Sequence, residues 1–529
     1  MKHSTFFTGA VIASALTVSA GAVSAQTLTM GVRGGPESLD PHFSALGSHA
    51  EAAKHIFDTL VWSADDLQIE PGLATSWEPV DDDTWVFKLR EGVTFHDGSS
   101  FDAEDVKFSI ERIPVVSGPT TTTIYVRRVK EVEIVDPLTL HVHTDGPAAT
   151  LPYDFVRLFI VSSDAAAEFS TPETASAGFN SGKATIGTGP YKFVSWEPKG
   201  DLVLERFDGY WRGMGPWETV TRKEIPNDSS RLAALKAGQV DIINYVSSVD
   251  YLALQNDPSV ETIIGDSVYV MNLQLDQREE TPGVRAKDGS KLPENPLRDE
   301  RVREAMDLAI DRQAMVDIVL EGLGKPANQM MPPGFFGSNP GIPMPEHDPE
   351  KARGLLAEAG YPDGFEIDLY CTSDRLPGDA AICQGLGQML SQIGIKTNVN
   401  AMSKTVYFPA QARKEYSVFM NGWGTLTGEA SYTLGSLAHS ADEEKKLGAF
   451  NRIDYRNEKV DELLETGATE LDADKRRALY EEAMALTMAD KVYISIVQLQ
   501  TVWAAKAGKL TFTPRFDEDT LAYHITPAS

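Results

Sequence analysis

The chain has 529 residues, of which 42% are hydrophobic and 24% charged, and it carries a formal net charge of −29. This composition is typical of a globular protein, and the length exceeds one ordinary core, so two or three domains are expected. The 48 basic residues form no concentrated patch against the 77 acidic ones, which argues against nucleic acid as a partner.

The N-terminus has the pattern of a secretory signal peptide. A short basic start is followed by an apolar stretch at residues 6–18 and a small-residue cleavage site at residues 23–25. We therefore expect residues 1–25 to be removed, so that the mature protein begins at Gln26 in the periplasm of a Gram-negative cell. A retained N-terminal anchor is the alternative. No second apolar run is long enough to cross a bilayer.

Residues 57–112 predict a hairpin followed by a helix. Residues 76–80 and 84–90 are extended runs joined by an acidic turn, and the second run alternates apolar and polar side chains like a strand with one buried face. Asp102 is positioned to cap a helix over residues 103–113.

The rest of the chain alternates strands and helices. A helix over residues 228–238 precedes a strand at residues 240–243, which favours an α/β layer. A long helix is predicted over residues 298–321. Residues 365–401 predict a strand–helix–strand unit with a right-handed crossover and a parallel sheet. A last buried strand is predicted at residues 492–497.

Two cysteines lie in the strand–helix–strand unit. Cys371 ends the first strand and Cys383 lies in the helix. An exported protein can form a disulfide bond, but the sequence does not show whether the two Cα atoms come within about 7 Å. A bridge and two buried free thiols both remain open.

Four linked motifs in residues 57–109 identify a family resemblance. They read F-D-x-L, P-x-L-A-x-S-W, W-x-F-x-L-R-x-G-V-x-F-H-D-G and F-x-A-E-D-V-x-F-S, and two further blocks occur at residues 187–211 and 295–312. The chain resembles the dipeptide/oligopeptide/nickel class of ABC-transporter solute-binding proteins, family 5 of the bacterial extracellular solute-binding proteins. The resemblance implies a two-lobed α/β periplasmic-binding-protein fold, with an α+β subdomain inserted in the first lobe and a hinge cleft between the lobes.

The resemblance also implies domain boundaries. Lobe I would comprise residues 26–58, 182–270 and 498–529. The inserted subdomain would comprise residues 59–181, and lobe II residues 271–497.

A glycine-rich loop after the strand at residues 418–423 is the first candidate ligand site. Open α/β sheets bind ligands at strand ends, and Trp423, Gly424 and Thr425 lie at such an end. Related peptide binders carry an acid in this loop that meets the ligand's amino group, and Glu429 matches it, although Glu replaces Asp and the neighbouring Pro-Asp pair is missing. The alternatives are a surface charge for Glu429 and core filling for Trp423.

Arg375 is the second candidate. It lies between a strand and the following helix, where the helix N-terminus also favours an anion, and arginine suits a carboxylate. Some dipeptide-binding relatives place an arginine near this point for the carboxyl end of the ligand. The alternative is a surface ion pair with Asp374 or Asp379.

Further lining residues are predicted from both lobes. The family-like loop at residues 34–41, with Leu39 and Asp40, would line the cleft from lobe I and could pair with an extended peptide. Tyr407 and Tyr432 would contribute from lobe II.

Enzyme and metal motifs are not found in the sequence. There is no H-E-x-x-H and no G-x-S-x-G. His141 and His143 lie on one face of a strand, as a metal pair could, but no third ligand is evident. We therefore expect no catalysis, no cofactor and no metal site.

These observations predict a monomeric substrate-binding component of an ABC importer. It would capture a peptide or peptide-like solute by hinge closure and deliver it to the inner-membrane permease. Within the same fold the solute could instead be an opine, glutathione, a sugar or a metal chelate. A secreted peptide hydrolase is the alternative from another class.

Overall fold

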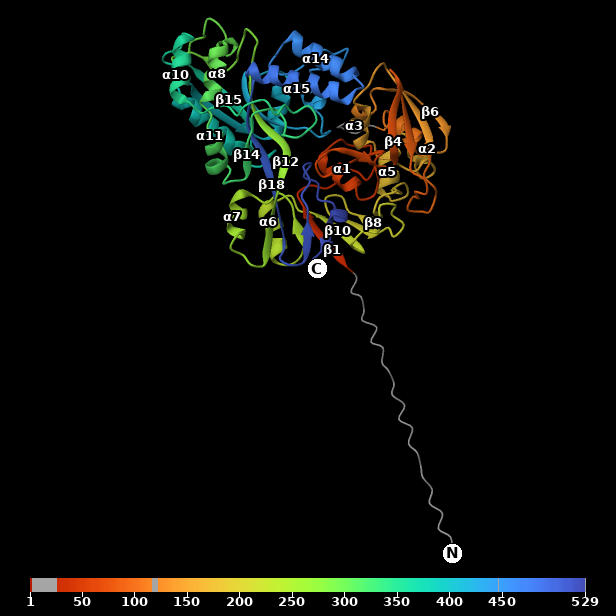
Figure 1. Cartoon of the computed structure of the whole chain (residues 1–529). Coiled ribbons are helices and arrows are strands. Elements are labelled where there is room, and N and C mark those ends of the chain that lie inside the picture. The colour runs from red at the N-terminus through yellow and green to blue at the C-terminus, as the bar shows by residue number, and fades with distance from the viewer. Residues whose placement is uncertain (2–25, 117–121, 446, 529) are drawn as a thin grey trace.

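The computed structural model of the chain describes Met1 and residues 26–116, 122–445 and 447–528 (Figure 1). The predicted signal peptide, with its cleavage site at residues 23–25, lies outside the described residues.

A large mixed sheet runs through the molecule. Within the described residues it has 12 strands, and its main path is β13-β15-β17-β12-β18-β11-β1-β10-β9-β8. The long strands β12 (Val260–Leu275) and β18 (Tyr493–Lys506) pair antiparallel and connect the upper and lower parts of the molecule in Figure 1. Their pairing register shifts between Asp266 and Val270, so the two-strand ribbon is irregular near its middle.

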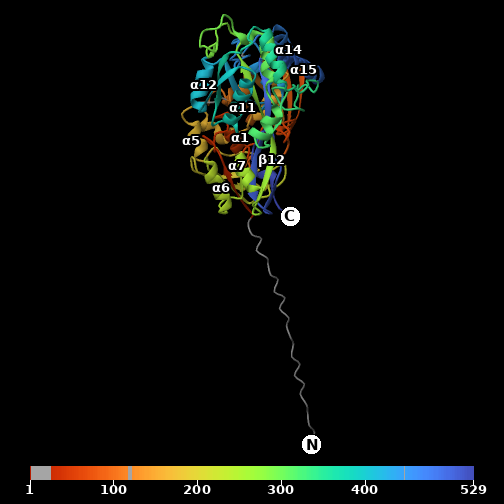
Figure 2. The same cartoon turned by 90° about the vertical axis from the view of Figure 1, so that its left-hand side faces the viewer.

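The upper part surrounds one end of this ribbon. Figure 2 shows from the side that α11 and α12 belong to this part, whereas α6 and α7 lie below. Besides β12 and β18, its elements are β13 (Val284–Arg285), β14 (Gly324–Pro326), β15 (Glu366–Thr372), β16 (Lys396–Met402), β17 (Val418–Gly424), α8 (Glu300–Leu308), α9 (Arg312–Ala314), α10 (Pro349–Glu358), α11 (Asp379–Gln392), α12 (Lys404–Ala412), α13 (Ala430–Leu437), α14 (Glu458–Thr469) and α15 (Ala473–Ala489).

The lower part is built on the other end of the ribbon, and its strands extend the same sheet. Its elements are β1 (Thr27–Val32), β8 (Tyr191–Trp196), β9 (Asp201–Arg206), β10 (Thr219–Glu224), β11 (Ile242–Ile243), β19 (Leu510–Phe512), β20 (Ile525–Pro527), α1 (Gly47–Ala53), α6 (Asp228–Lys236) and α7 (Ser248–Leu254).

A third part has its own four-stranded sheet, ordered β4-β5-β7-β6, at the right of Figure 1. Its helix α2 begins at the predicted cap, where Asp102 and Asp105 form a reciprocal capping box. Its elements are β2 (Val61–Ser63), β3 (Ile69–Pro71), β4 (Ala74–Asp81), β5 (Thr84–Leu89), β6 (Val129–Asp136), β7 (Thr139–Thr144), α2 (Ala103–Arg112), α3 (Leu151–Asp154), α4 (Ser163–Ala166) and α5 (Ala175–Asn180).

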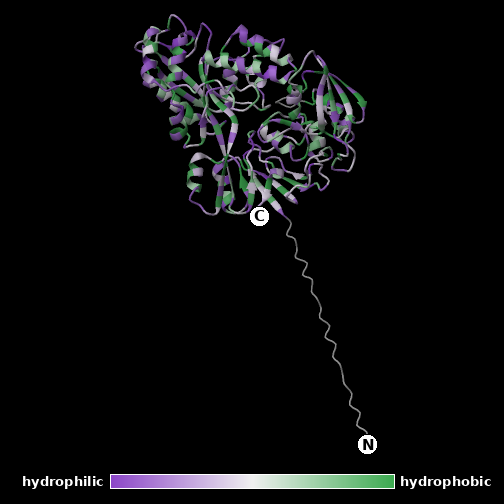
Figure 3. Cartoon of the chain, viewed as in Figure 1, coloured by the Kyte–Doolittle hydropathy of each residue, from purple (hydrophilic) through white to green (hydrophobic). Residues whose placement is uncertain are grey.

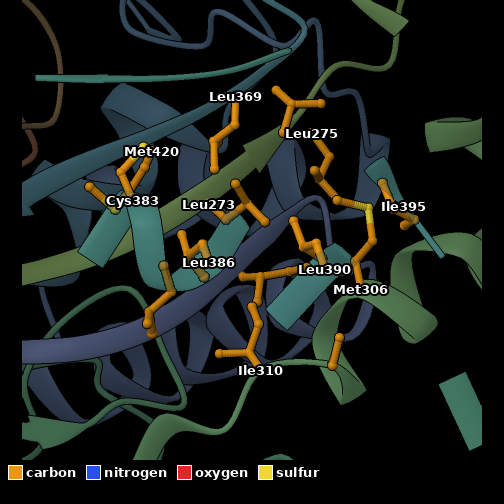
Figure 4. Packing of buried hydrophobic residues seen from close by; sticks show 14 of the residues in the cluster. Leu273, Leu275, Met306, Ile310, Leu369, Cys383, Leu386, Leu390, Ile395 and Met420 are labelled. Carbon is orange, nitrogen blue, oxygen red and sulfur yellow. The ribbon is translucent and has the colours of Figure 1, made fainter. Parts of the chain in front are cut away.

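Hydrophobic residues concentrate on the inner strands, and the outer helices carry the hydrophilic stretches (Figure 3). In the upper part, Leu273 of β12, Leu369 of β15 and Leu386 of α11 pack in one buried cluster (Figure 4). The third part has a separate cluster of its own, centred on residues such as Phe87. None of the helices in the described ranges has the length and apolar character that crossing a membrane requires.

The predicted strand–helix–strand unit is confirmed, because β15 and β16 pair in parallel across α11. Cys371 and Cys383 form a disulfide bond, with their Cα atoms 6.5 Å apart, which decides the question that the sequence left open. The bond links β15 to α11 directly.

The prediction of one long helix over residues 298–321 is wrong. Helix α8 ends at Leu308, and the side chain of Asp311 accepts a hydrogen bond from the Ala314 amide and starts a new helix there. The buried guanidinium of Arg312 donates to the carbonyl oxygens of Ala327 and Ser495, at 3.1 and 2.8 Å. These contacts, to the residue that follows β14 and to β18, fix a break that helical periodicity alone cannot reveal.

Candidate functional site

A cavity of about 790 Å³ lies between the upper and lower parts, beside β18. One wall comes from the lower part and the other from the loop before α11 and the turn before β14. A cavity of this size, lined from two parts of a chain, is typical of a small-molecule site. Its polar lining residues include Arg33, Asp228, Ser247, Asp374, Gln500 and Thr501.

Charged groups on the lower wall are paired with one another. Arg33 donates to Asp228 at 3.1 Å and stacks over the Tyr245 ring at 4.9 Å. The Tyr245 hydroxyl in turn donates to Glu518 at 3.0 Å, and Thr501 donates to the same carboxylate at 2.5 Å. Burial raises the pKa of Glu518, because the charged form loses its hydration.

Arg375 stands at the edge of this cavity. Its neighbours Asp374 and Leu376 line the cavity, whereas its own guanidinium donates to the side chain of Asn421 and the carbonyl of Gly422, both at 2.7 Å. The side chain therefore turns toward β17 and pairs with neither predicted acid.

The end of β17 carries an aromatic pair. The ring centroids of Trp423 and Tyr432 lie 5.5 Å apart. The indole Nε1 of Trp423 is buried and has no hydrogen-bond partner among the described residues. A buried donor without an acceptor is costly, so this position favours a ligand that supplies one.

Gly424 and Thr425 shape the loop from inside. A Cβ on Gly424 would lie 2.9 Å from side-chain atoms of both Val268 and Tyr269, so only glycine fits without movement. The hydroxyl of Thr425 is buried and lies 2.8 Å from that of Thr433. Both residues hold the backbone that presents Trp423.

Arg157, from the third part of the chain, lies near Tyr432. The sequence analysis did not predict it. Only 6% of the residue is exposed, and it has no ion pair or hydrogen bond within the described ranges. Burial disfavours its charge, but Tyr125, Asp519 and Asp517 outweigh that effect and raise the pKa of Arg157. Its signal in the sequence is a single arginine within the apolar run at residues 155–161.

Both arginines act on the pKa of Tyr432. Burial is the main reason that its pKa is raised, Tyr125 and Tyr269 raise it further, and Arg157 and Arg375 act in the opposite direction. All four side chains are therefore within Coulombic reach of Tyr432. The structure gathers residues from three separate parts of the chain around one aromatic ring.

Glu429 lies behind the loop, in contact with Arg476. Its side chain is 0% exposed, and Oε1 is 3.3 Å from Nε of Arg476 without hydrogen-bond alignment. Burial raises the pKa of Glu429 to about 8, and the guanidinium offsets this only in part. The carboxylate faces a cation of the chain itself.

Three other predicted residues are fully packed. Asp40 accepts two hydrogen bonds from Arg112, at 2.9 and 2.6 Å, and Leu39 belongs to the lower hydrophobic core. Tyr407 is buried and donates to the carbonyl of Met420 at 3.1 Å. None of these three lines the cavity.

The comparisons with known proteins agree with this architecture. The sequence model described as bacterial extracellular solute-binding proteins, family 5 middle region, matches residues 68–445. The chain belongs to this family. This family 5 protein is therefore a solute-binding component of an ABC importer, and its family consists of transport components rather than enzymes.

Relatives of this family 5 protein match it over most of their length. The glutathione-binding protein GsiB of Salmonella paratyphi A is 27% identical over 497 residues, which cover 93% of this chain and 92% of the relative. The structure of HbpA2 from Haemophilus parasuis is 24% identical with a TM-score of 0.79, covering 95% of this chain and 99% of the other.

A third similar structure is the periplasmic binding protein DppA from Helicobacter pylori in complex with the peptide STSA. It is 24% identical with a TM-score of 0.73 and covers 95% of this chain and 98% of the other. These likenesses confirm the predicted two-lobed periplasmic-binding-protein fold.

Proposed function

We propose that this protein binds a small peptide or peptide-like solute between its lobes, in the periplasm, and delivers it unchanged to an ABC permease. The observation that carries the proposal is the cavity of about 790 Å³, which draws its walls from both sides of β18. A solute that contacts both walls stabilises the closed form over the open one, which is how a binding protein closes on its ligand.

The predicted boundaries are kept as part of this proposal. Lobe I is residues 26–58, 182–270 and 498–529, with residues 59–181 inserted, and lobe II is residues 271–497. Separate buried clusters in the upper part and in the inserted segment support this division. β12 and β18 would then be the two segments that connect the lobes.

The preferred solute carries a carboxylate. Two buried groups near Tyr432 that lack partners among the described residues, Nη1 of Arg157 and Nε1 of Trp423, are both hydrogen-bond donors. A carboxylate can accept charge-assisted hydrogen bonds from such donors, and a buried guanidinium is costly without one. The related proteins named for glutathione and crystallised with a peptide bind solutes of this class.

Arg375 adjoins the cavity, whereas Arg157, Trp423 and Tyr432 lie outside its lining. These four residues would contact the part of the solute that reaches from the cavity toward β17. Gly424, Thr425, Tyr407, Leu39 and Asp40 would support the walls, and Glu429 would act through the loop that it anchors.

A ligand screen tests the proposal. Thermal unfolding is followed with glutathione, di- and tripeptides, opines, sugars and metal chelates. A true ligand at about 100 times its dissociation constant adds about 2.7 kcal/mol of stability. We expect carboxylate-bearing peptides or glutathione to give this shift. Stabilisation by a neutral sugar alone would contradict the solute class but leave the binding role intact.

The fate of the solute separates a carrier from a hydrolase. After incubation with a binding peptide, chromatography should return the peptide intact. Appearance of its fragments, growing in proportion to protein concentration, would overturn the transport proposal.

Two further experiments test the state of the protein in the cell. N-terminal sequencing of the exported protein should begin at Gln26, as the small-residue site at residues 23–25 predicts. Light scattering should give the mass of a monomer with and without ligand. A dimer that forms with ligand would change the proposed mode of docking to the permease.

A further inference from the structure

Three metal-ligating side chains converge on the outer face of the four-stranded sheet, outside the solute cavity. Glu133 lies on β6, and His141 and His143 lie on the neighbouring strand β7. The pairing register sets His141 directly opposite Glu133. Because alternate residues of a strand share a face, His143 joins them on the same side of the sheet.

The distances fit a single bound cation. Oε2 of Glu133 is 3.4 Å from Nδ1 of His141 and 3.5 Å from Nε2 of His143. Two tetrahedral ligands at about 2.1 Å from Zn²⁺ are separated by about 3.4 Å. The three ligand atoms lie within 4.8 Å of one another, so a small rotation of the imidazoles completes the set.

A fourth residue fixes the orientation of one ligand. Nδ1 of His143 lies 3.1 Å from the hydroxyl of Thr84 on β5. If Nδ1 carries the proton and donates to Thr84, the lone pair of Nε2 is directed at Glu133. A histidine ligand commonly donates its other ring N–H to such a partner, which holds the ring and its tautomer in place.

A plain surface ion pair explains the arrangement less well. Both imidazole rings direct a nitrogen at the same oxygen of Glu133. A cation placed between the three atoms satisfies all of them at once. Sequence reasoning found the histidine pair but not its third ligand, because Glu133 comes from the preceding strand.

We propose that Glu133, His141 and His143 form a site for a divalent transition cation of the Zn²⁺ class. Two imidazoles and one carboxylate suit Zn²⁺, Co²⁺, Ni²⁺ and Cu²⁺, whereas Ca²⁺ and Mg²⁺ prefer all-oxygen ligand sets. The side chains are 58%, 31% and 32% exposed, so solvent can reach the cation and water fills its remaining positions. The site is independent of the solute cavity.

Titration with ZnCl₂ tests the site, on chain that carries no histidine tag. Isothermal titration should show one equivalent of Zn²⁺ bound. The double variant His141→Ala/His143→Ala should lose that equivalent, and Glu133→Gln should raise the Kd at least about tenfold. Thr84→Val, which removes only the orienting hydroxyl, should raise it about tenfold.

A matched control uses the other exposed histidine–carboxylate contact. Nδ1 of His347 lies 3.5 Å from Asp311, an arrangement with one imidazole and one carboxylate. His347→Ala should leave Zn²⁺ binding unchanged. Melting curves without metal should match wild type for the histidine and Glu133 variants, whose side chains are partly exposed. Thr84→Val also removes a buried hydroxyl and should lower stability slightly.

Two outcomes would overturn the proposal. One is Zn²⁺ binding that persists unchanged in the double variant, and the other is wild-type protein that binds no Zn²⁺. Zn²⁺ binding and solute binding are measured separately. A variant that loses one and keeps the other shows that the Zn²⁺ site and the proposed transport function are independent. Replacing Zn²⁺ by Co²⁺ adds a visible absorption band that only a ligand-bound cobalt ion of low symmetry gives strongly.

Discussion

Two buried arginines, Arg112 and Arg157, differ in whether the protein supplies an ion-pair partner. Arg112 donates to both oxygens of Asp40 and to the carbonyl of Phe169, and its guanidinium stacks on Phe179. Arg157 is nearly as buried but has no direct partner within the described residues. The fold gives Arg112 an ion pair, although its Nε has no hydrogen-bond partner among the described residues, whereas Arg157 has no ion pair there.

The difference shows how a buried charge separates structure from function. A paired and fully hydrogen-bonded ion holds segments of the chain together, and removing one partner leaves an uncompensated charge. Burial disfavours the charge of Arg157 as well, and Tyr125, Asp519 and Asp517 offset this cost, but the guanidinium has no direct partner among the described residues. Because it lies within Coulombic reach of Tyr432, we propose that a bound solute is its direct partner.

The largest expected effect is at the completed ion pair. Arg112→Met should destabilise the protein by about 3–5 kcal/mol, because it leaves Asp40 buried and unpaired. Arg157→Met should change stability by less than about 1 kcal/mol, since no pair is broken. Urea unfolding of both variants without ligand measures the contrast. Equal losses would remove the distinction between the two arginines.

Glu429 offers an intermediate case, because it faces Arg476 without an aligned hydrogen bond. The folded-state pKa of about 8 lies above the ordinary value of 4.5, so the folded protein retains a proton in this window. The contribution of Glu429 to stability should be highest below pH 4.5 and fall by about 1.4 kcal/mol per pH unit as the pH rises toward 8.

Glu429→Gln should flatten that pH dependence, and unfolding curves at pH 5 and pH 8 measure it. Glu443→Gln, at an exposed position, serves as the control and should leave the slope as in wild type. A slope that survives in Glu429→Gln would place the titrating group elsewhere. The same variant tests the sequence prediction that Glu429 contacts the amino group of a ligand. If it does, Glu429→Gln should also lower the affinity for ligands with a free amine.

The third effect concerns affinity. Arg157→Gln should weaken binding of glutathione, used as the carboxylate-bearing probe, by about 100-fold, because charge-assisted hydrogen bonds contribute about 1.5–3 kcal/mol. Arg157→Lys keeps the charge but not the forked donors and should retain part of the affinity. Calorimetry measures both. Unchanged affinity in Arg157→Gln would remove this residue from the site.

The smallest effect is at the indole. Trp423→Phe keeps the ring against Tyr432 and removes only Nε1–H, so the Kd should rise by no more than about tenfold. Trp503→Phe is the matched control, since the indole of Trp503 already donates to Thr520 at 2.9 Å. That control should lower stability without changing affinity, as ligand titrations and melting curves can show.

Local patterns were enough to predict much of the fold. The hairpin with its Asp102 cap and the unit that contains β15 and β16 follow from alternation, capping and turn residues, and the structure confirms them. The break at Asp311 was missed because contacts to distant strands enforce it. Such contacts do not change the helical spacing of apolar residues in the sequence.

The candidate site was predicted only in part, for the same reason. Arg375 and Trp423 were predicted because they lie at strand ends, and Tyr432 was predicted as a further lining residue. The partner of Asp40 is 72 residues away, and Glu429 meets Arg476 from another helix. In the sequence, Arg157 is one polar residue in an apolar run. Only the three-dimensional structure shows that its Nη1 is buried without a hydrogen-bond partner among the described residues.

The irregular ladder between β12 and β18 has a mechanical consequence. The pairing register shifts between Asp266 and Val270 and again between Met271 and Asn272. The side-chain amide of Gln498 donates to the carbonyl of Ser267 at this point, in addition to the pairing of Gln498 with Val270. The break in regular pairing therefore lies where the ribbon passes between the upper and lower parts, and we expect torsion of the ribbon to concentrate there.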